Sequence, residues 1–504
     1  MNLLISLTLA SLVLFILQFY IRCIQRSYSL KKAYARHGCA SPKNLPSKDP
    51  IFGLDTVVEN VKTMKNHCRM RAIQTQARNY GHTFQSFPFG RRTLTTTSAR
   101  NIQTVLSLEH EKFGVRPIRG PAEAMTGPGI ISNDGKVWEH ARAMIRPAFT
   151  RAQIADRELF DAHIERFFSL LPTDGTAVDL QPLFDRLILD ASSEFIFGES
   201  FGSLLPSCPI DSQKFLDSFN NAQKGVGIRV LLGNMRFLMR DRNFSESCKL
   251  IQDYTQKHID RALQQPQQQK KSEEDSAISQ RKCILVYELA KETSDRSLLC
   301  NQLLNVFFAG RDTPAVALTN IFFLLARHPE VWKKCRGEIQ GLQKEDLTFE
   351  RLKSLRYIQH VINEAMRLYP PVAAQTRGCV APAILPTGGG PDGSRPIHVQ
   401  SGDTVIINFF TLHRDSKMFA PDPEVFRPER WIDARPTWEF LPFGGGARHC
   451  PAQQLALFWV AYTLVRMLLI FREIRNEDPV EDFVENMKLN MESLNGAKVS
   501  FVSV

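Results

Sequence analysis

Apolar residues recur along most of the chain at the three- and four-residue spacing of amphipathic helices, up to about residue 375. The clearest helical stretches are 151–171, 247–264, 285–327 and 351–369. After about residue 375 the pattern changes to glycine-rich turns and short β-rich runs such as DTVIINFF, and one more helical stretch follows. The pattern therefore predicts a mainly α-helical fold with a small β part.

An uncharged and almost wholly apolar run occupies residues 3–21. At 1.5 Å per residue it would span roughly 30 Å, the hydrocarbon thickness of a bilayer. The basic residues that follow it would keep the rest of the chain in the cytosol; they are Arg22, Arg26, Lys31, Lys32 and Arg36. We expect a single-pass transmembrane signal anchor, and a cleaved signal peptide is the weaker reading because the run is long and has no small-x-small cleavage site.

The sequence divides into three parts on this interpretation. Residues 1–22 form the anchor, and residues 23–55 form a proline-rich hinge. Within the hinge, Pro42, Pro46 and Pro50 are expected to keep residues 36–55 free of secondary structure. Residues 56–504 form one folded domain. Within it, the polar, glutamine-rich stretch 264–282 is expected to be an exposed loop between helices.

Charge and cysteine content narrow the classes of partner and of site. The 504 residues carry a formal net charge of +11, which favours an acidic protein, a phospholipid surface or an anionic cofactor. Nucleic acid is disfavoured because no basic and aromatic stripe is present. The ten cysteines form no CxxC pair, so a zinc site or a disulfide framework is not expected.

One cysteine stands in a loop with special chemistry, FGGGARHC at residues 443–450. The three glycines can adopt positive φ and let the backbone approach a ligand closely. Arg448 is permanently charged and suits a carboxylate. Cys450 precedes a helical stretch, whose first amides favour a thiolate. A thiolate, a close-approach loop and a carboxylate-binding arginine fit haem, whereas a plain glycine loop with a buried cysteine is the simpler alternative.

This loop resembles the cysteine-ligand loop of the cytochrome P450 superfamily, the haem-thiolate monooxygenases. The matching residues are Phe443, Gly446, Arg448, Cys450 and Ala452, of which Ala452 stands where many members have glycine. The resemblance implies the P450 fold, with Cys450 as the axial ligand of the haem iron and Arg448 on a propionate. Stretches such as TGPGIISNDGKVWEHARAMIRPAF look most like the fungal microsomal branch that oxidises alkanes and fatty acids.

Two further sequences resemble motifs of the same family. Glu364 and Arg367 lie at i and i+3, where they share a helix face and can pair. Arg430, in FRPERW, resembles their third partner, and the resemblance gives this trio a structural role in the haem-binding core. Trp138 and Arg142, at i and i+4, resemble residues that meet a haem propionate, and so does Arg377. A surface cation–π pair is the alternative for Trp138 and Arg142.

The stretch AGRDTP, residues 309–314, lies in a helical run of about 34 residues, which would be roughly 50 Å long. Thr313 can donate its hydroxyl to the carbonyl of Ala309 and so bend the helix. Pro314 lacks an amide and its ring meets the carbonyl of Gly310. By resemblance, Asp312 and Thr313 are the acid and alcohol that deliver protons during oxygen activation; a plain proline kink is the alternative.

The resemblance implies a monooxygenase at the endoplasmic reticulum membrane that uses haem b, dioxygen and electrons from NADPH. These electrons would come from a separate NADPH–cytochrome P450 reductase, with cytochrome b5 as a further donor, because no flavin or nicotinamide motif is present. A fatty acid or alkane is the expected substrate, and tailoring of a polyketide or terpenoid is the alternative. A reductase-independent isomerase or dehydratase is a second alternative, against which Asp312 and Thr313 argue. Apolar pocket walls are expected at Ile130, Phe307, Phe308, Val372, Ala373 and Leu494, with packing in the core as the alternative for the aromatic residues.

Overall fold

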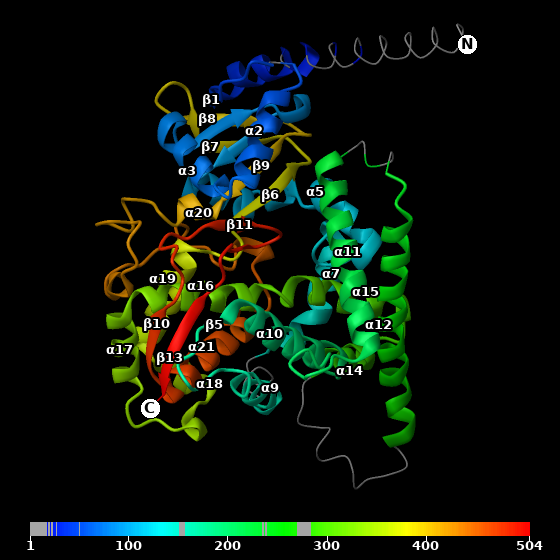
Figure 1. The fold of residues 1–504 in the computed structure, drawn as a ribbon. Coiled ribbons are helices and arrows are strands. Elements are labelled where there is room, and N and C mark those ends of the chain that lie inside the picture. The colour runs from blue at the N-terminus through cyan, green and yellow to red at the C-terminus, as the bar shows by residue number, and fades with distance from the viewer. Residues whose placement is uncertain are drawn as a thin grey trace, which may run out of the picture.

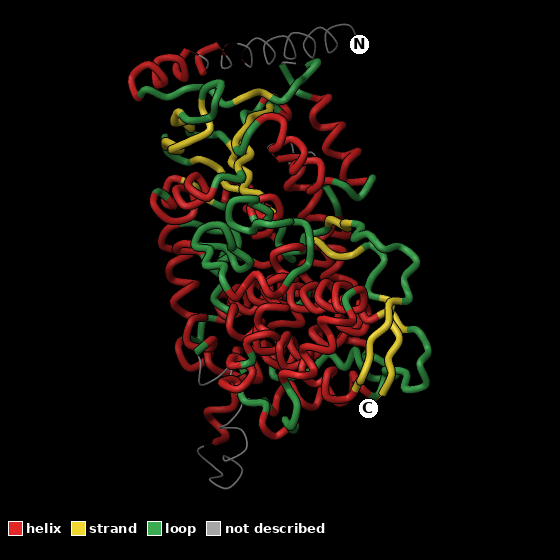
Figure 2. Tube along the Cα trace, turned by 90° about the vertical axis from the view of Figure 1, so that its left-hand side faces the viewer, coloured by secondary structure: helices red, strands yellow, loops and turns green. Residues whose placement is uncertain are grey.

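Helices make up most of the computed structural model, which describes residues 18, 21, 24–26, 28–49, 51–150, 157–233, 236, 239–269 and 284–503. Most strands lie at the end of the molecule near the N-terminus, whereas β10 and β13 lie at the opposite end beside the C-terminus, and the long helices fill the space between (Figures 1 and 2). The predicted mainly α-helical class with a small β part is confirmed.

The α-helices differ greatly in length, and the longest surround the central pair α15 and α16. They are α2 Leu54–Lys65, α3 Arg69–Tyr80, α4 Ala99–Gln103, α5 Arg116–Arg119, α6 Glu123–Thr126, α7 Gly135–Ile145, α9 Glu158–Phe168, α10 Leu180–Phe197, α11 Ile210–Leu232, α12 Arg242–Gln269, α14 Leu285–Glu292, α15 Arg296–Gly310, α16 Thr313–Arg327, α17 Pro329–Glu338, α18 Phe349–Ser354, α19 Arg356–Leu368, α20 Phe409–Leu412 and α21 Gln453–Ile470.

The strands form one six-stranded sheet in the order β1-β2-β3-β9-β6-β4, a three-stranded sheet in the order β10-β13-β5, and two hairpins, β7-β8 and β11-β12. Their bounds are β1 Lys43–Asn44, β2 Thr83–Ser86, β3 Thr93–Thr96, β4 Phe113–Gly114, β5 Val178–Asp179, β6 Ala374–Cys379, β7 Ala383–Gly389, β8 Arg395–Val399, β9 Thr404–Asn408, β10 Phe471–Asn476, β11 Glu485–Met487, β12 Met491–Ser493 and β13 Lys498–Ser503.

The six-stranded sheet combines strands from distant parts of the sequence. The helical periodicity of the chain did not predict the strands near the N-terminus. Strand β3 pairs in parallel with β9, and β9 pairs antiparallel with β6. We expected the β structure to lie in the last 130 residues. That expectation was incomplete, because strands β1 to β4 come from the first 114 residues. Helix α12 also continues to Gln269, into the stretch expected to be a loop, and the rest of that stretch lies outside the described residues.

The segment expected to be a hinge packs against the sheet. Residues 28–37 are helical, and β1 pairs in parallel with β2. Arg26 forms an ion pair with the buried Asp403, whose other carboxylate oxygen accepts a hydrogen bond from Arg92 Nη1 at 3.1 Å. The expectation that residues 36–55 lack secondary structure is therefore wrong for the helical residues 36 and 37, for β1 and for the first two residues of α2. Prolines are tolerated beside a short edge strand such as β1.

One described helix is long and apolar enough to cross a membrane, Gln453–Ile470. It is 67% buried inside the protein, which is typical of a core helix. The apolar run at residues 3–21, predicted to be the membrane anchor, lies outside the described residues apart from residues 18 and 21.

A buried carboxylate joins the end of α19 to the segment before the cysteine loop. Glu364 is fully buried and accepts five hydrogen bonds, from the side chains of Arg367, Arg430 and Trp431 and from the amide of Arg427. The two arginines also donate to backbone carbonyls, and both reach that of Val425. The structure therefore brings together the three residues that the sequence paired.

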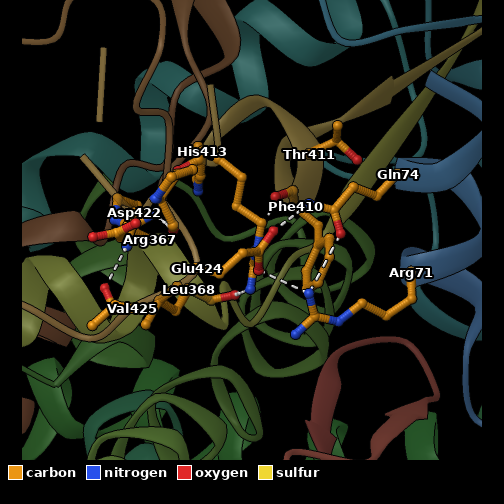
Figure 3. A network of polar contacts seen from close by, with 12 residues as sticks. Arg71, Gln74, Arg367, Leu368, Phe410, Thr411, His413, Asp422, Glu424 and Val425 are labelled. Atoms are coloured by element: carbon orange, nitrogen blue, oxygen red, sulfur yellow. Dashed lines mark hydrogen bonds and ion pairs between the residues drawn. The ribbon is translucent and has the colours of Figure 1, made fainter. Parts of the chain in front are cut away.

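A second network extends this one toward α3 (Figure 3). Glu424 receives hydrogen bonds from Arg71 at 2.8 Å, Gln74 at 2.5 Å and Arg414 at 2.9 Å. Burial opposes ionisation, but Arg414, Gln74 and Arg71 together lower the pKa of Glu424 to about 2. The carboxylate therefore stays charged and ties α3 to the segment that follows α20.

Replacing Glu364 by Gln should strongly destabilise the protein. It removes a buried charge and leaves two buried guanidinium groups without a counter-charge, which costs about 3–5 kcal/mol. Thermal unfolding would measure this loss. Glu246→Gln is the matched control, because the Arg242–Glu246 pair is 91% and 60% exposed and should contribute under about 0.5 kcal/mol. Equal stability of both variants would contradict a central role for Glu364.

Candidate active site

The backbone of the cysteine loop depends on glycine. Gly446 has a φ of +67°, and a Cβ atom there would lie 1.9 Å from the carbonyl oxygen of Leu106. Gly444 has a φ of +71°. The loop is closed by a hydrogen bond of 3.0 Å from the amide of Cys450 to the carbonyl of Phe443. The glycines therefore allow both the turn and its close contact with the segment around Leu106.

The Cys450 thiol is half-buried just before α21. Burial raises its pKa, whereas the amide of Ala452 and the charge of Arg142 lower it. No cluster of three or more His, Cys, Asp or Glu side chains that could hold a metal ion occurs within the described ranges. A metal would thus meet Cys450 as a single protein ligand, as haem iron does in haem-thiolate proteins.

Arg119, Arg142, Arg377 and Arg448 lie in this region, and among the described residues Asp134 is the carboxylate that opposes their charge. Burial and mutual repulsion lower the pKa of Arg377 to about 9 and, against the opposing charge of Asp134, that of Arg448 to about 10. Arg119 and Arg142 belong to the same electrostatic cluster. Concentrated positive charge of this kind requires an anion, and the two propionates of haem fit it.

Arg448 and Arg142 both lie near Trp138. The Cζ atom of Arg448 is 4.4 Å from the Trp138 ring centroid and that of Arg142 is 6.0 Å away. Arg448 Nη2 also contacts Asp134 at 2.7 Å and the carbonyl of Asn133 at 2.7 Å. Arg142 Nη1 donates to the carbonyl of His449 at 2.9 Å. The structure thus brings Trp138, Arg142 and Arg448 together at the cysteine loop.

Arg377 lies on β6 and is almost fully buried. It donates to the carbonyl of Thr376 at 3.2 Å and to the side chain of Gln375 at 2.9 Å, contacts that fix its direction and leave its charge unbalanced. Its neighbour Arg119 also belongs to the arginine cluster, although no sequence motif pointed to Arg119. Burial lowers the pKa of Arg119 as well.

His413 connects the Glu364 network to the cysteine loop, and sequence analysis missed it. Its backbone carbonyl accepts a hydrogen bond of 3.0 Å from Arg367 Nη1, and its Nε2 atom accepts one of 2.9 Å from the amide of Leu441 (Figure 3). Burial and the charges of Arg367 and Arg414 lower the pKa of His413 to about 3. The neutral imidazole can therefore accept this bond and hold the loop in place.

The central helix breaks at the AGRDTP sequence. Helix α15 ends at Gly310 and α16 begins at Thr313. The Thr313 hydroxyl donates to the carbonyl of Ala309 at 2.7 Å, as predicted, and Pro314 lies in the first turn of α16, where no amide is needed. Two helices therefore replace the single long helix that was expected.

Asp312 lies at this break, paired with the neighbouring Arg311. Ala309, the next-to-last residue of α15, is exposed, although Phe307 and Phe308 just before it are buried. An open surface at the middle of a central helix gives the Thr313 hydroxyl and the Asp312 carboxylate room for water or a small molecule.

The expected pocket walls divide into two groups. Phe307 is fully buried in a cluster of aromatic rings with Phe215 and Phe219, and Ala373 is buried as well, so neither has an open face. Phe308 is 8% exposed, and Leu494 is 43% exposed. Ile130 and Val372 are half-buried. Phe307 thus fits the alternative that aromatic stripes in helices pack as core.

Comparisons with known proteins agree with this geometry. The family model for cytochrome P450 matches residues 46–497. This chain belongs to the cytochrome P450 family. It is 39% identical to the cytochrome P450 monooxygenase himC of Aspergillus japonicus over 92% of this chain and 83% of that protein. It is 35% identical to fsdH of Fusarium heterosporum (97% and 88% covered) and 34% identical to cytochrome P450 52A12 of Debaryomyces hansenii (88% of each).

Gly446→Ala should disrupt the cysteine loop. The new methyl group would enter the space of the Leu106 carbonyl in a left-handed conformation, which costs more than about 1 kcal/mol. We expect a lower melting temperature and a smaller fraction of protein with bound haem. Gly337→Ala in α17 is the control, because its Cβ would meet nothing within 4 Å and it should be neutral or stabilising. Unchanged haem content in Gly446→Ala would contradict the loop geometry.

Proposed function

We propose that this monooxygenase inserts one oxygen atom from dioxygen into a C–H bond of a lipophilic, fatty-acid- or alkane-like substrate. Electrons would come from NADPH through a separate reductase. The observation that carries the proposal is the meeting of one thiol, Cys450, with an arginine cluster of excess positive charge. Haem b, held there, would supply the iron centre at which dioxygen is reduced.

Each part of the site has a role in this proposal. Cys450 would ligate the haem iron through its thiolate, in the loop that Gly446 permits. Arg142, Arg377 and Arg448, with Trp138 against them, bind the carboxylates of the cofactor. Thr313 holds a water molecule at the break between α15 and α16, and Asp312 exchanges protons with it.

Two features support a lipophilic substrate. The exposed Ala309 places apolar surface beside the helix break. The apolar run at residues 3–21 favours a membrane location, and we propose a single-pass anchor in the endoplasmic reticulum membrane with the folded domain in the cytosol. A substrate dissolved in the bilayer would then be close to the enzyme.

A ring-bearing polyketide or terpenoid is the second candidate substrate. An isomerase or dehydratase without a reductase is disfavoured, since Asp312 and Thr313 both stand at the helix break.

A spectral titration of the ferric protein should separate the two substrate classes. We expect long-chain fatty acids to shift the iron toward high spin, and members of a terpenoid and polyketide panel to have little effect. A shift with a ring-bearing compound alone would assign the protein to tailoring chemistry and leave the haem site unaffected.

Cys450→Ser should abolish the thiolate absorption band of the reduced carbon monoxide complex. Cys68→Ser is the control, because Cys68 is half-buried at the N-cap of α3, where serine is well tolerated. Persistence of the band in Cys450→Ser would disprove Cys450 as the ligand.

A further inference from the structure

One arginine connects the break in the central helix to a neighbouring helix. Arg311 lies between α15 and α16, and only 12% of its side chain is exposed. Its Nε atom is 2.7 Å from Oδ1 of Asp312, and its Nη2 atom donates to Oδ1 of Asn220 on α11 at 2.8 Å. Its guanidinium also stacks on Phe219 of α11, with Cζ 4.7 Å from the ring centroid. One side chain therefore binds the candidate acid and α11 together.

The guanidinium of Arg311 links the position of Asp312 to the position of α11. It is planar and rigid, so its Nε and Nη2 atoms move as one unit. A shift of α11 that carried Phe219 and Asn220 with it would turn the whole group and lengthen the contact with Asp312. Conversely, a fixed α11 holds the Asp312 carboxylate in its ion pair.

The remaining contacts allow such a shift. Helix α11 meets α15 through aromatic rings, with Phe219 5.0 Å and Phe215 5.4 Å from Phe307 between ring centroids. Ring packing of this kind has little directionality, so it tolerates small displacements better than hydrogen bonds do. Among the described contacts between α11 and the helix break, the bond to Asn220 is the directional one.

Arg311 also balances a second carboxyl group near the break. Burial, followed by the charges of Asp312 and Glu492, raises the pKa of Asp185 on α10 to about 7, and Lys488 and Arg311 oppose this rise. Arg311 is thus a positive charge shared by two carboxyl groups. Removing it therefore takes a positive charge away from Asp185 as well as from Asp312.

We propose that Arg311 is a latch that keeps the Asp312 carboxylate paired until a substrate displaces α11. A substrate lying against Phe308 and Ala309 would push on α11, draw the guanidinium away through Asn220 and Phe219, and free Asp312 for proton exchange. Arg311 is thus a positioning residue. The inference rests on the proposed function, because it assumes that Asp312 handles protons.

The kinetic test uses Asn220→Ala, Arg311→Gln and the double variant. Asn220→Ala cuts the link to α11 and leaves Arg311 on Asp312, so kcat should fall about threefold, with a larger solvent isotope effect and unchanged KM. Arg311→Gln frees Asp312 permanently, so NADPH oxidation without substrate should rise about threefold. The double variant should behave like Arg311→Gln, because without Arg311 the Asp312 carboxylate has no ion pair from which to be released.

The probe is dodecanoic acid, or the titration compound that gives the spin-state shift. Asn221→Ala is the matched control, since Asn221 is the next exposed residue of α11 and takes no part in the Arg311 contacts described above. If kcat of the double variant were as low as that of Asn220→Ala or lower, the latch would be disproved. The contact between Arg311 and Asn220 would then be structural only.

A second measurement does not depend on turnover. Hydrogen–deuterium exchange over residues 213–232 of the ferric protein should increase when the probe is added, and in Arg311→Gln it should already be high without probe. No response to either change would overturn the latch. If exchange responds but Asp312→Asn keeps normal coupling of NADPH to product, the acid role of Asp312 and the gating of protons both fail, while the haem-thiolate function stands.

Discussion

The buried carboxylate of Glu364 is the interaction on which the site depends. Two guanidinium groups, an indole and a backbone amide surround it, and the same guanidinium groups bind the carbonyls of the segment that follows α20. A charge without this set of partners would be expensive to bury, so the network forms only as a whole. His413 connects this network to the segment before the cysteine loop, because its carbonyl accepts a hydrogen bond from Arg367 and its Nε2 atom accepts one from the amide of Leu441.

The site built on this support has a consistent electrostatic logic. The arginines near Cys450 repel one another, and burial adds to the cost, which is why the pKa values of Arg377 and Arg448 are low. Asp134 offsets only part of that charge. A dianionic cofactor therefore stabilises the fold as it binds, because it supplies the missing negative charge where the protein has concentrated positive charge.

Local sequence patterns predicted the parts of this structure that local physics controls. The Thr313 hydroxyl bond to Ala309 and the need for glycine at position 446 follow from backbone geometry over a few residues. The pairing of Glu364 with Arg367 follows from helix periodicity. Strands β2 and β3 were missed because each has only four residues and depends on its neighbours in the sheet, and the neighbour β9 of β3 lies more than three hundred residues away in the chain.

The sequence by itself indicated the family, the candidate thiol ligand and a bend in the central helix, since each depends on residue types at short, fixed spacing. Only the tertiary structure decided which other residues join them. Arg119, His413 and Asn220 lie far from the motifs in the chain, and no short-range pattern marks them. Their roles arise because folding concentrates charge and buries hydrogen-bonding groups, so that the partner of each group is chosen by position in space and not by distance along the chain.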